Sequence, residues 1–172
     1  WQTLINPETW ISEHIQHLTG INNDMVSVAP TFEKVSKEVL ERLSGFVFIA
    51  HNARFDYGFI KNEFKRCGVK FKASVLCTMK LSRTLFPDQQ RHNLDSIMHR
   101  HGLICSGRHR ACGDARVLFD FMCALYLQLD AEDVDNVITQ LLKKPSRPSL
   151  LSEEQIDNVP SDSGVYQFYD KK

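Results

Sequence analysis

A run of five apolar residues at positions 46–50 (FVFIA) constrains the fold of this chain more than any other sequence feature. Amphipathic helix patterns stand on both sides of it, at residues 31–43 and at residues 54–67. A strand as apolar as this one is typical of a sheet that is covered on both faces. Residues 74–77 predict a second short strand, and the alternation of strands with helices indicates the α/β class.

The apolar spacing also predicts which helical side chains are buried. In the helix after the apolar run, we expect Phe55, Phe59, Ile60 and Phe64 to face inward. Further helices are predicted at residues 78–86, 93–101 and 113–129. Residues 1–5 (WQTLI) read as a strand that Asn6-Pro7 ends.

Composition excludes several classes of protein. With 172 residues, 42% apolar and 24% charged, the chain suits one globular domain. No apolar run approaches the length that crosses a bilayer, so we expect no membrane partner. Five cysteines without a CxxC pair predict free thiols in a reducing, cytoplasmic setting.

Charge is distributed unevenly along the chain although the net charge is zero. Residues 61–116 hold twelve Lys or Arg against four Asp or Glu. A basic segment of this kind suits a polyanionic partner such as nucleic acid, and it equally suits a solvated surface with its charges spread over several faces.

A first candidate site follows the apolar strand, in the sequence IAHNARFD at residues 49–56. Asp56 is expected in the first turn of a helix, near the positive end of the helix dipole. A carboxylate at the strand ends of an α/β fold is a good ligand for a hard cation. The structural alternative makes Asp56 a helix-start residue and Asn52 a turn residue.

A second candidate site is HRACGD at residues 109–114. His109 in a polar loop can accept a proton near neutral pH, and Asp114 is expected at the start of the longest helix. A loop histidine and a capping aspartate are the structural alternative. Cys105, His109 and Cys112 also have a zinc-like spacing, but no fourth ligand with suitable spacing stands near them.

Together the two segments resemble the second and third motifs of the DnaQ-like DEDDh 3′–5′ exonucleases, whose familiar member is the proofreading subunit of bacterial DNA polymerase III. The order and separation of the motifs agree with that family. The resemblance extends over about residues 1–129 and includes four further segments: WQTLINPE at 1–8, LTGI at 18–21, APTF at 29–32 and NLD at 93–95.

The resemblance implies an RNase H-like mixed sheet flanked by helices and a two-metal hydrolysis of the last phosphodiester of DNA with Mg²⁺ or Mn²⁺. Asp56 and Asp114 would be metal ligands and catalytic carboxylates, and His109 would be the general base. The other family positions would contact the single-stranded 3′ end, with an apolar wedge at the terminal base: Leu18, Gly20, Ile21, His51, Asn52 and Phe55.

This sequence departs from the family in one major respect. The first motif, D-x-E on the first strand, has no counterpart here, so we expect a domain that lacks its first strands and two of its four carboxylates. We therefore expect the chain by itself to bind Mg²⁺ poorly and to degrade DNA slowly or not at all. Cys77 also stands where the family has Asp.

The residues after the exonuclease-like part carry a second resemblance. Residues 156–170 are similar to the opening of a UvrC-type GIY-YIG endonuclease domain, with Gly164-Val165-Tyr166 matching its first half-signature. We therefore expect an exonuclease domain at residues 1–130, a helix with a Pro/Ser-containing linker at 131–160, and the beginning of a GIY-YIG domain at 161–172.

Three functions remain open at this point. The first is a DNA exonuclease in replication proofreading or repair, working with a DNA polymerase or a repair complex. The second is an RNA-directed DEDDh nuclease. The third is a non-catalytic module that binds nucleic acid or acts as a scaffold.

Overall fold

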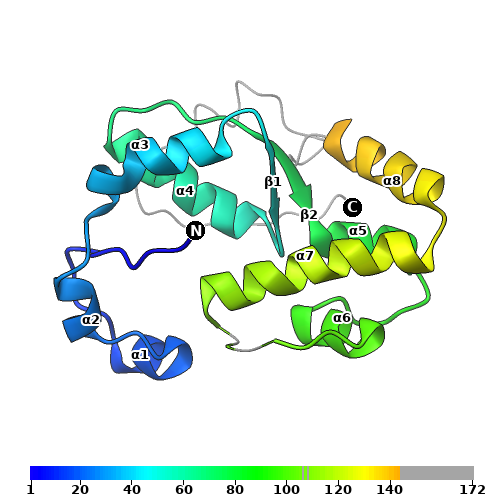
Figure 1. Ribbon diagram of the computed structural model, residues 1–172, viewed down its shortest axis with the longest axis horizontal. Coiled ribbons are helices and arrows are strands. Elements are labelled where there is room, and N and C mark those ends of the chain that lie inside the picture. Colours follow the sequence, from blue (N-terminus) through cyan, green and yellow to red (C-terminus); the bar gives the residue numbers. More distant parts are fainter. Residues whose placement is uncertain (106, 108, 144–172) are drawn as a thin grey trace, which may run out of the picture.

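The computed structural model describes residues 1–105, 107 and 109–143. Two short parallel strands form the sheet, and β1 pairs with β2 in register from Val47 with Ser74 to Ala50 with Cys77. The elements run in the order α1 (Glu13–Thr19), α2 (Asn23–Ser27), α3 (Phe32–Leu43), β1 (Val47–Ala50), α4 (Arg54–Arg66), β2 (Ser74–Cys77), α5 (Thr78–Leu85), α6 (Leu94–His101), α7 (Ala111–Gln128) and α8 (Ala131–Lys143) (Figure 1).

Local signals explain where the helices begin and end. The Asn93 side chain accepts a hydrogen bond of 2.8 Å from the Ser96 N–H and so caps α6, while Gly102 ends that helix in the left-handed conformation. The sequence patterns placed α3, α4, α5, α6 and α7 within two residues of their observed ends. These predictions are confirmed, as is the second strand at Ser74–Cys77.

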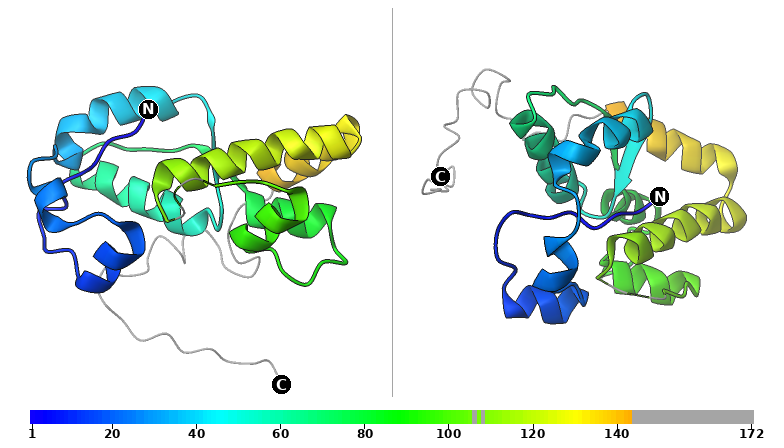
Figure 2. Two further views of the ribbon diagram at one scale, coloured as in Figure 1. Left: turned by 60° about the horizontal axis from the view of Figure 1, so that its bottom comes forward. Right: turned by 60° about the vertical axis from the view of Figure 1, so that its left-hand side comes forward.

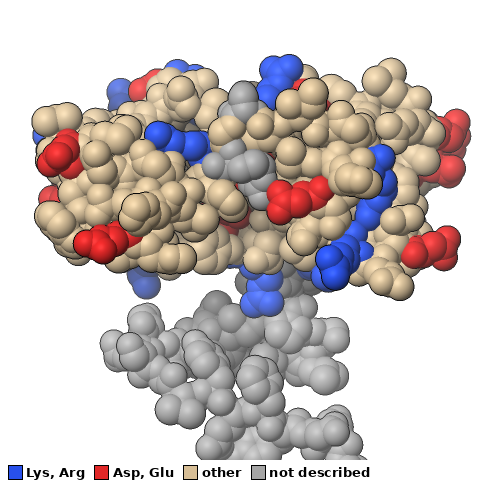
Figure 3. Space-filling view, turned by 90° about the horizontal axis from the view of Figure 1, so that it is seen from below, with Lys and Arg blue, Asp and Glu red and all other residues tan. Residues whose placement is uncertain are grey.

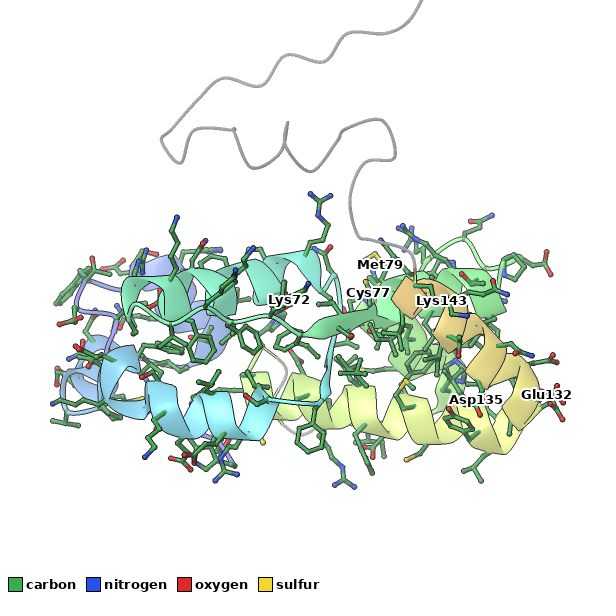
Figure 4. All side chains as sticks on the ribbon, turned by 90° about the horizontal axis from the view of Figure 1, so that it is seen from above. Lys72, Cys77, Met79, Glu132, Asp135 and Lys143 are labelled. Atoms are coloured by element: carbon green, nitrogen blue, oxygen red, sulfur yellow. The ribbon has the colours of Figure 1, made fainter. Side chains whose placement is uncertain are left out.

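The strands lie between α4 on one side and α7 on the other (Figure 4). The core around them contains two clusters that differ in the type of side chain. One cluster is mainly aliphatic and joins β2 to α5, α6, α7 and α8; its fully buried members include Leu76, Leu81, Phe121 and Val134. A second, between α3 and α4, is mainly aromatic, with the Phe64 and Phe71 rings 4.9 Å apart. The order of the strands and helices agrees with the α/β class expected from the sequence.

The predicted strand at residues 1–5 is wrong. That segment runs as extended chain, Trp1 is 60% exposed, and the nearest ladder contact is a single bridge between Asn6 and Thr31. A β-propensity pattern becomes a strand only when another strand offers its N–H and C=O groups. Among the described residues, the sheet contains β1 and β2 alone, and this segment is paired with neither.

Two burial predictions are also wrong. Val47 and Ile49, on one face of β1, are 41% and 42% exposed, so the apolar run is not covered on both faces. Phe55 and Phe59 are 63% and 58% exposed, whereas Phe64 of the same helix is fully buried. In both cases the apolar pattern predicted a covering layer that the described residues do not supply. Among the residues that the structure describes, no helix is both long and apolar enough to cross a membrane.

Candidate active site at the starts of two helices

Asp56 lies in the first turn of α4, where the chain leaves β1 and turns back. The turn needs a left-handed residue, and Asn52 supplies it with a φ of 59°. The Phe55 N–H then donates to the Asn52 carbonyl at 3.0 Å, and Ala53 is 1% exposed. Asp56 is thereby held at the carboxyl end of β1, where sites in α/β folds collect.

His51 ties this turn to the neighbouring strand. Its Nδ1 lies 3.0 Å from the Thr78 hydroxyl, which donates in turn to the Ala50 carbonyl at 3.3 Å. Thr78 is fully buried and is the first residue of α5, directly after β2. The carboxyl ends of the two parallel strands are therefore fixed to each other beside Asp56.

Asp114 occupies the corresponding place in the first turn of α7. Its N–H donates to the Arg110 carbonyl at 2.9 Å, and α7 packs against β1. The pKa of Asp56 is raised above its usual value, mainly because burial penalises the charged form. A hydrogen bond to its own backbone opposes this shift, and the negative charge of Asp114 adds to it. The two carboxylates are 58 positions apart in sequence, yet their charges interact electrostatically in the fold.

The loop before α7 carries His109 in the left-handed conformation, with a φ of 64°. Gly113 allows this loop to lie close over the first turn of α7. A Cβ at residue 113 would meet the Gly107 carbonyl oxygen at 2.3 Å, a distance that real Cβ contacts do not show. Gly113 therefore fixes how closely the histidine loop approaches the helix that bears Asp114.

Arg110 connects this loop to a segment far away in sequence. Its Nη2 donates to the Gly20 carbonyl at 3.1 Å. Gly20 ends α1 in the left-handed conformation, with Leu18 44% exposed before it and Ile21 after it. The α1–α2 segment consequently lies beside the start of α7 (Figure 2). The predicted wedge residues are brought to the same end of the molecule as Asp114.

Phe55 forms part of an exposed aromatic pair at the start of α4. Its ring lies 4.7 Å from that of Phe59. The sequence pattern assigned both to the core, but exposed rings next to a carboxylate present flat faces on which bases can stack. Phe55 thus stays available for the substrate-contacting role that the resemblance implies.

The donor chemistry fits a divalent cation of the Mg²⁺ type. Carboxylate oxygens are the ligands that such ions prefer, and each carboxylate stands at the start of its helix. Among the described residues, no three His, Cys, Asp or Glu side chains are gathered as a metal site, whether at the two aspartates or around Cys105, His109 and Cys112. Asp56 and Asp114 can therefore supply two ligands and leave the others to be supplied elsewhere.

Comparison with known proteins gives this arrangement a family. Residues 1–122 match RNase_T, a family described as exonuclease. This chain belongs to the RNase_T exonuclease family. The match includes both motif segments, the LTGI segment and the start of α7.

Curated relatives of this exonuclease-family chain are much longer proteins. It is 30% identical over 138 residues to the 3′-5′ exonuclease DinG of Staphylococcus saprophyticus, covering 80% of this chain and 15% of the relative. It is 35% identical over 137 residues to a PolC-type DNA polymerase III of Caldanaerobacter subterraneus, covering 80% of this chain and 10% of that polymerase. The chain thus spans a small part of the relatives that it matches.

A solved structure of Exonuclease X in complex with 5′ overhanging duplex DNA superposes with a TM-score of 0.55 at 22% identity, covering 78% of each chain. This likeness confirms the RNase H-like α/β fold class predicted from the sequence. The DNA in that complex is bound by Exonuclease X, and the likeness to this chain concerns the fold alone.

Three residues of this RNase_T site escaped the sequence analysis: Thr78, Arg110 and Gly113. Residues 105–110 (CSGRHR) contain two arginines, but no local pattern tells which of them reaches back 90 positions to Gly20. Thr78 looked like an ordinary helix-start residue, and Gly113 like a helix residue of low propensity. Their roles depend on neighbours that are distant in sequence.

Proposed function

We propose that this chain forms part of a metal-dependent 3′–5′ exonuclease of the DEDDh type that hydrolyses the terminal phosphodiester of DNA. The observation that carries the proposal is the placement of Asp56 and Asp114 in the first turns of α4 and α7, two helices that both pack against β1. The negative charge of Asp114 also contributes to the raised pKa of Asp56. Two such carboxylates and a histidine on an adjoining loop supply part of what this hydrolysis requires.

In this proposal each residue has a defined role. Asp56 and Asp114 hold divalent ions, Mg²⁺ or Mn²⁺, which when bound would stabilise the attacking and leaving oxygens. His109 accepts the proton of the attacking water at an imidazole nitrogen. His51 and Asn52 shape the turn beside the phosphate, and Phe55 offers a ring to a base.

The terminal base is received by the segment that ends α1. Leu18 is partly exposed, and Ile21 follows the left-handed Gly20, whose carbonyl Arg110 holds. We infer that one of these apolar side chains wedges against the last base and separates it from its neighbour. A single-stranded 3′ end suits this arrangement because its last base is free to turn away.

The remaining carboxylates are proposed to come from a D-x-E strand that pairs with the open edge of β1. Among the described residues β1 pairs with β2 alone, and the unpaired N–H and C=O groups along its other edge support this inference. Residues 1–130 are proposed as the exonuclease domain and 131–160 as a helix and linker. The structure adds that α8 packs on the core through Val134.

The proposed GIY-YIG opening at residues 161–172 lies outside the described residues. We infer a role in proofreading or repair, within the cytoplasm, and a DNA polymerase or repair complex as partner. The names of the DinG and PolC-type relatives support DNA over RNA as the substrate.

The test is digestion of 3′-recessed DNA by the protein extended upstream of Trp1. We expect Mg²⁺-dependent release of 5′-mononucleotides, and a loss of about 10²–10⁴-fold in rate for His109→Ala, the usual contribution of a general base. His99→Ala, at an exposed position of α6, is the matched control. For Asp114→Asn the control is Asp120→Asn, six residues further along the same helix.

The result also separates the competing functions. An extended protein that stays inactive with Mg²⁺ and Mn²⁺, but binds single-stranded DNA, would contradict the nuclease proposal and favour a binding module. Faster digestion of RNA than of DNA would favour the RNA-directed nuclease.

A further inference from the structure

A stripe of basic side chains runs along the outer face of α4. Arg54, Lys61 and Lys65 stand at positions i, i+7 and i+11, which lie on one face of a helix with 3.6 residues per turn. All three are exposed, and none forms an ion pair with a described residue. Nitrogen-tipped side chains project from the side of α4 that faces away from α7 (Figure 4).

The stripe contains an open position. Gly58, at i+4 from Arg54, has no atom within 4 Å of the place where a Cβ would stand. A ligand strand can therefore approach the helix backbone between the arginine at the first turn and the two lysines beyond it.

At its far end the stripe meets a pocket of about 310 Å³. Lys61, Lys65 and Lys70 supply its charge, and its lining is completed by Gly68, Val69 and Phe71. The lining contains no carboxylate. Glu63, the acidic residue on this part of α4, forms an ion pair with Arg66. Lys72, which follows in the loop before β2, is also exposed (Figure 4).

On another face of the molecule the charges are mixed. On the face seen in Figure 3, Lys and Arg side chains lie among Asp and Glu side chains. The surface of α4 and the loop after it therefore accounts for much of the basic excess of residues 61–116 in a form that a polyanion can use.

We propose that this basic stripe, defined as Arg54, Lys61, Lys65 and Lys70, binds the phosphate backbone of a nucleic-acid strand at a distance from the site of hydrolysis. From Arg54 to Lys65 the helix rises about 16 Å, the span of about five phosphates along one strand of B-form DNA. Arg54 and Asp56 share the first turn of α4, but a separation of two residues turns the helix by about 200°, so the stripe and the candidate metal ligand lie on different faces of α4. The inference rests on the proposed function for the identity of the strand.

Binding to the stripe needs neither metal nor hydrolysis, so it is tested on the present chain in EDTA. Fluorescence anisotropy with a labelled 20-nucleotide oligo(dT) gives Kd over a series of salt concentrations. For the Lys61→Ala/Lys65→Ala/Lys70→Ala variant, we expect at least about tenfold weaker binding at low salt. The slope of log K against log salt should fall by about 2, since each phosphate contact to a single strand contributes about 0.7.

Matched variants remove the simpler explanations. Lys80→Ala/Arg83→Ala/Lys143→Ala removes three positive charges from α5 and α8, outside the stripe, and should keep the wild-type slope. Replacing Lys61, Lys65 and Lys70 by Arg should also keep it, because the interaction depends on charge rather than on lysine geometry. Circular dichroism of each variant checks that α4 is still formed.

Two outcomes would overturn the inference. One is an equal loss of affinity and slope in the stripe variant and the α5–α8 control. The other is a stripe that binds polyglutamate more tightly than oligo(dT) at the same salt, which would assign it to an acidic protein partner. Failure of the extended protein to hydrolyse DNA would contradict the proposed function and leave the stripe measurement standing.

Discussion

Two sides of this molecule bury their apolar residues to very different degrees. The closed side comprises β2, α5, α6, α8 and the inner face of α7, and six of its apolar residues form a buried cluster. The open side comprises residues 1–31, β1 and the first turns of α4 and α7. There Trp10, Val28, Val47 and Phe55 are between 41% and 88% exposed.

The difference separates the part of the fold whose apolar residues are buried from the part that holds the candidate catalytic residues. On the closed side every apolar stripe meets a partner from the chain itself, so it supplies most of the stability. The open side holds the candidate catalytic residues, and its apolar residues remain available to a further strand or to bases. Stability and function are therefore separated along α7, because its buried residues lie between Val117 and Leu125 whereas its first turn is not buried.

The largest expected effect tests this contrast on a single helix. Phe121 is fully buried and Phe119 is 58% exposed. Phe121→Ala should lower the free energy of unfolding by about 3–5 kcal/mol because it leaves a cavity in the aliphatic cluster. Phe119→Ala should change it by about 0.5 kcal/mol or less. Urea denaturation of both variants gives the two values, and similar losses would break the comparison.

Substitutions at two glycines, Gly113 and Gly58, test how tightly the His109 loop is held on the open side. Gly113→Ala should destabilise by about 1–3 kcal/mol, because the new Cβ would collide with the Gly107 carbonyl and displace the His109 loop. Gly58→Ala is the control within α4, and it should gain about 0.5–1 kcal/mol because the position is open and helical. Thermal unfolding measures both. A neutral Gly113→Ala would show that the loop is not held against α7.

His101, on the closed side, should make the free energy of unfolding depend on pH. Burial lowers its pKa, with Phe86 and Phe121 rings within 5.2 Å. The folded state therefore binds fewer protons than the unfolded state, so stability is present above about pH 6.5 and is lost as pH falls through the lowered pKa. The loss should be about 1 kcal/mol or less, since the group is partly solvated.

Urea denaturation at pH 7.5, 6.0 and 5.0 measures that loss. His101→Gln should flatten the pH dependence, whereas His99→Gln on the exposed side of α6 should leave it as it is. A wild-type protein that is equally stable at all three values would contradict the assignment.

The smallest expected effect is a pH dependence of stability that arises from Asp56 on the open side. Its direction is opposite to that of His101, because stability should rise as pH falls. The pKa of Asp56 is raised by burial and by Asp114, so the folded state binds the extra proton. Stability should therefore rise as pH falls from neutral through the raised pKa, and level off below about 3.8, the usual pKa of the unfolded chain. Asp56→Asn should stabilise the chain at neutral pH by less than about 1 kcal/mol, because solvent screens the pair.

Denaturant unfolding in EDTA checks this gain, with Asp120→Asn as control. Asp120 pairs with Arg116 at 3.1 Å, so its substitution should give no gain. A destabilised Asp56→Asn protein would show that the carboxylate serves the fold rather than a metal site.

The sequence by itself determined the helices from α3 to α7, the strand β2 and the two motif segments. Helix periodicity and caps are local properties, and residues such as Asn93 and Gly102 carry them within one turn of the chain. The family match over residues 1–122 confirms that the motif pattern was read correctly at the level of the exonuclease family. The roles of Asp56, Asp114 and His109 remain predictions.

Only the tertiary structure decided what surrounds those residues. An apolar pattern states that a side chain can be buried, but Val47, Phe55 and Phe59 are exposed because burial needs a second surface that no local pattern specifies. In the same way, the hydrogen bond from Arg110 to Gly20 joins residues 90 positions apart. Such a contact exists only once the packing of α7 against β1 and the path of residues 1–31 have brought the two segments together.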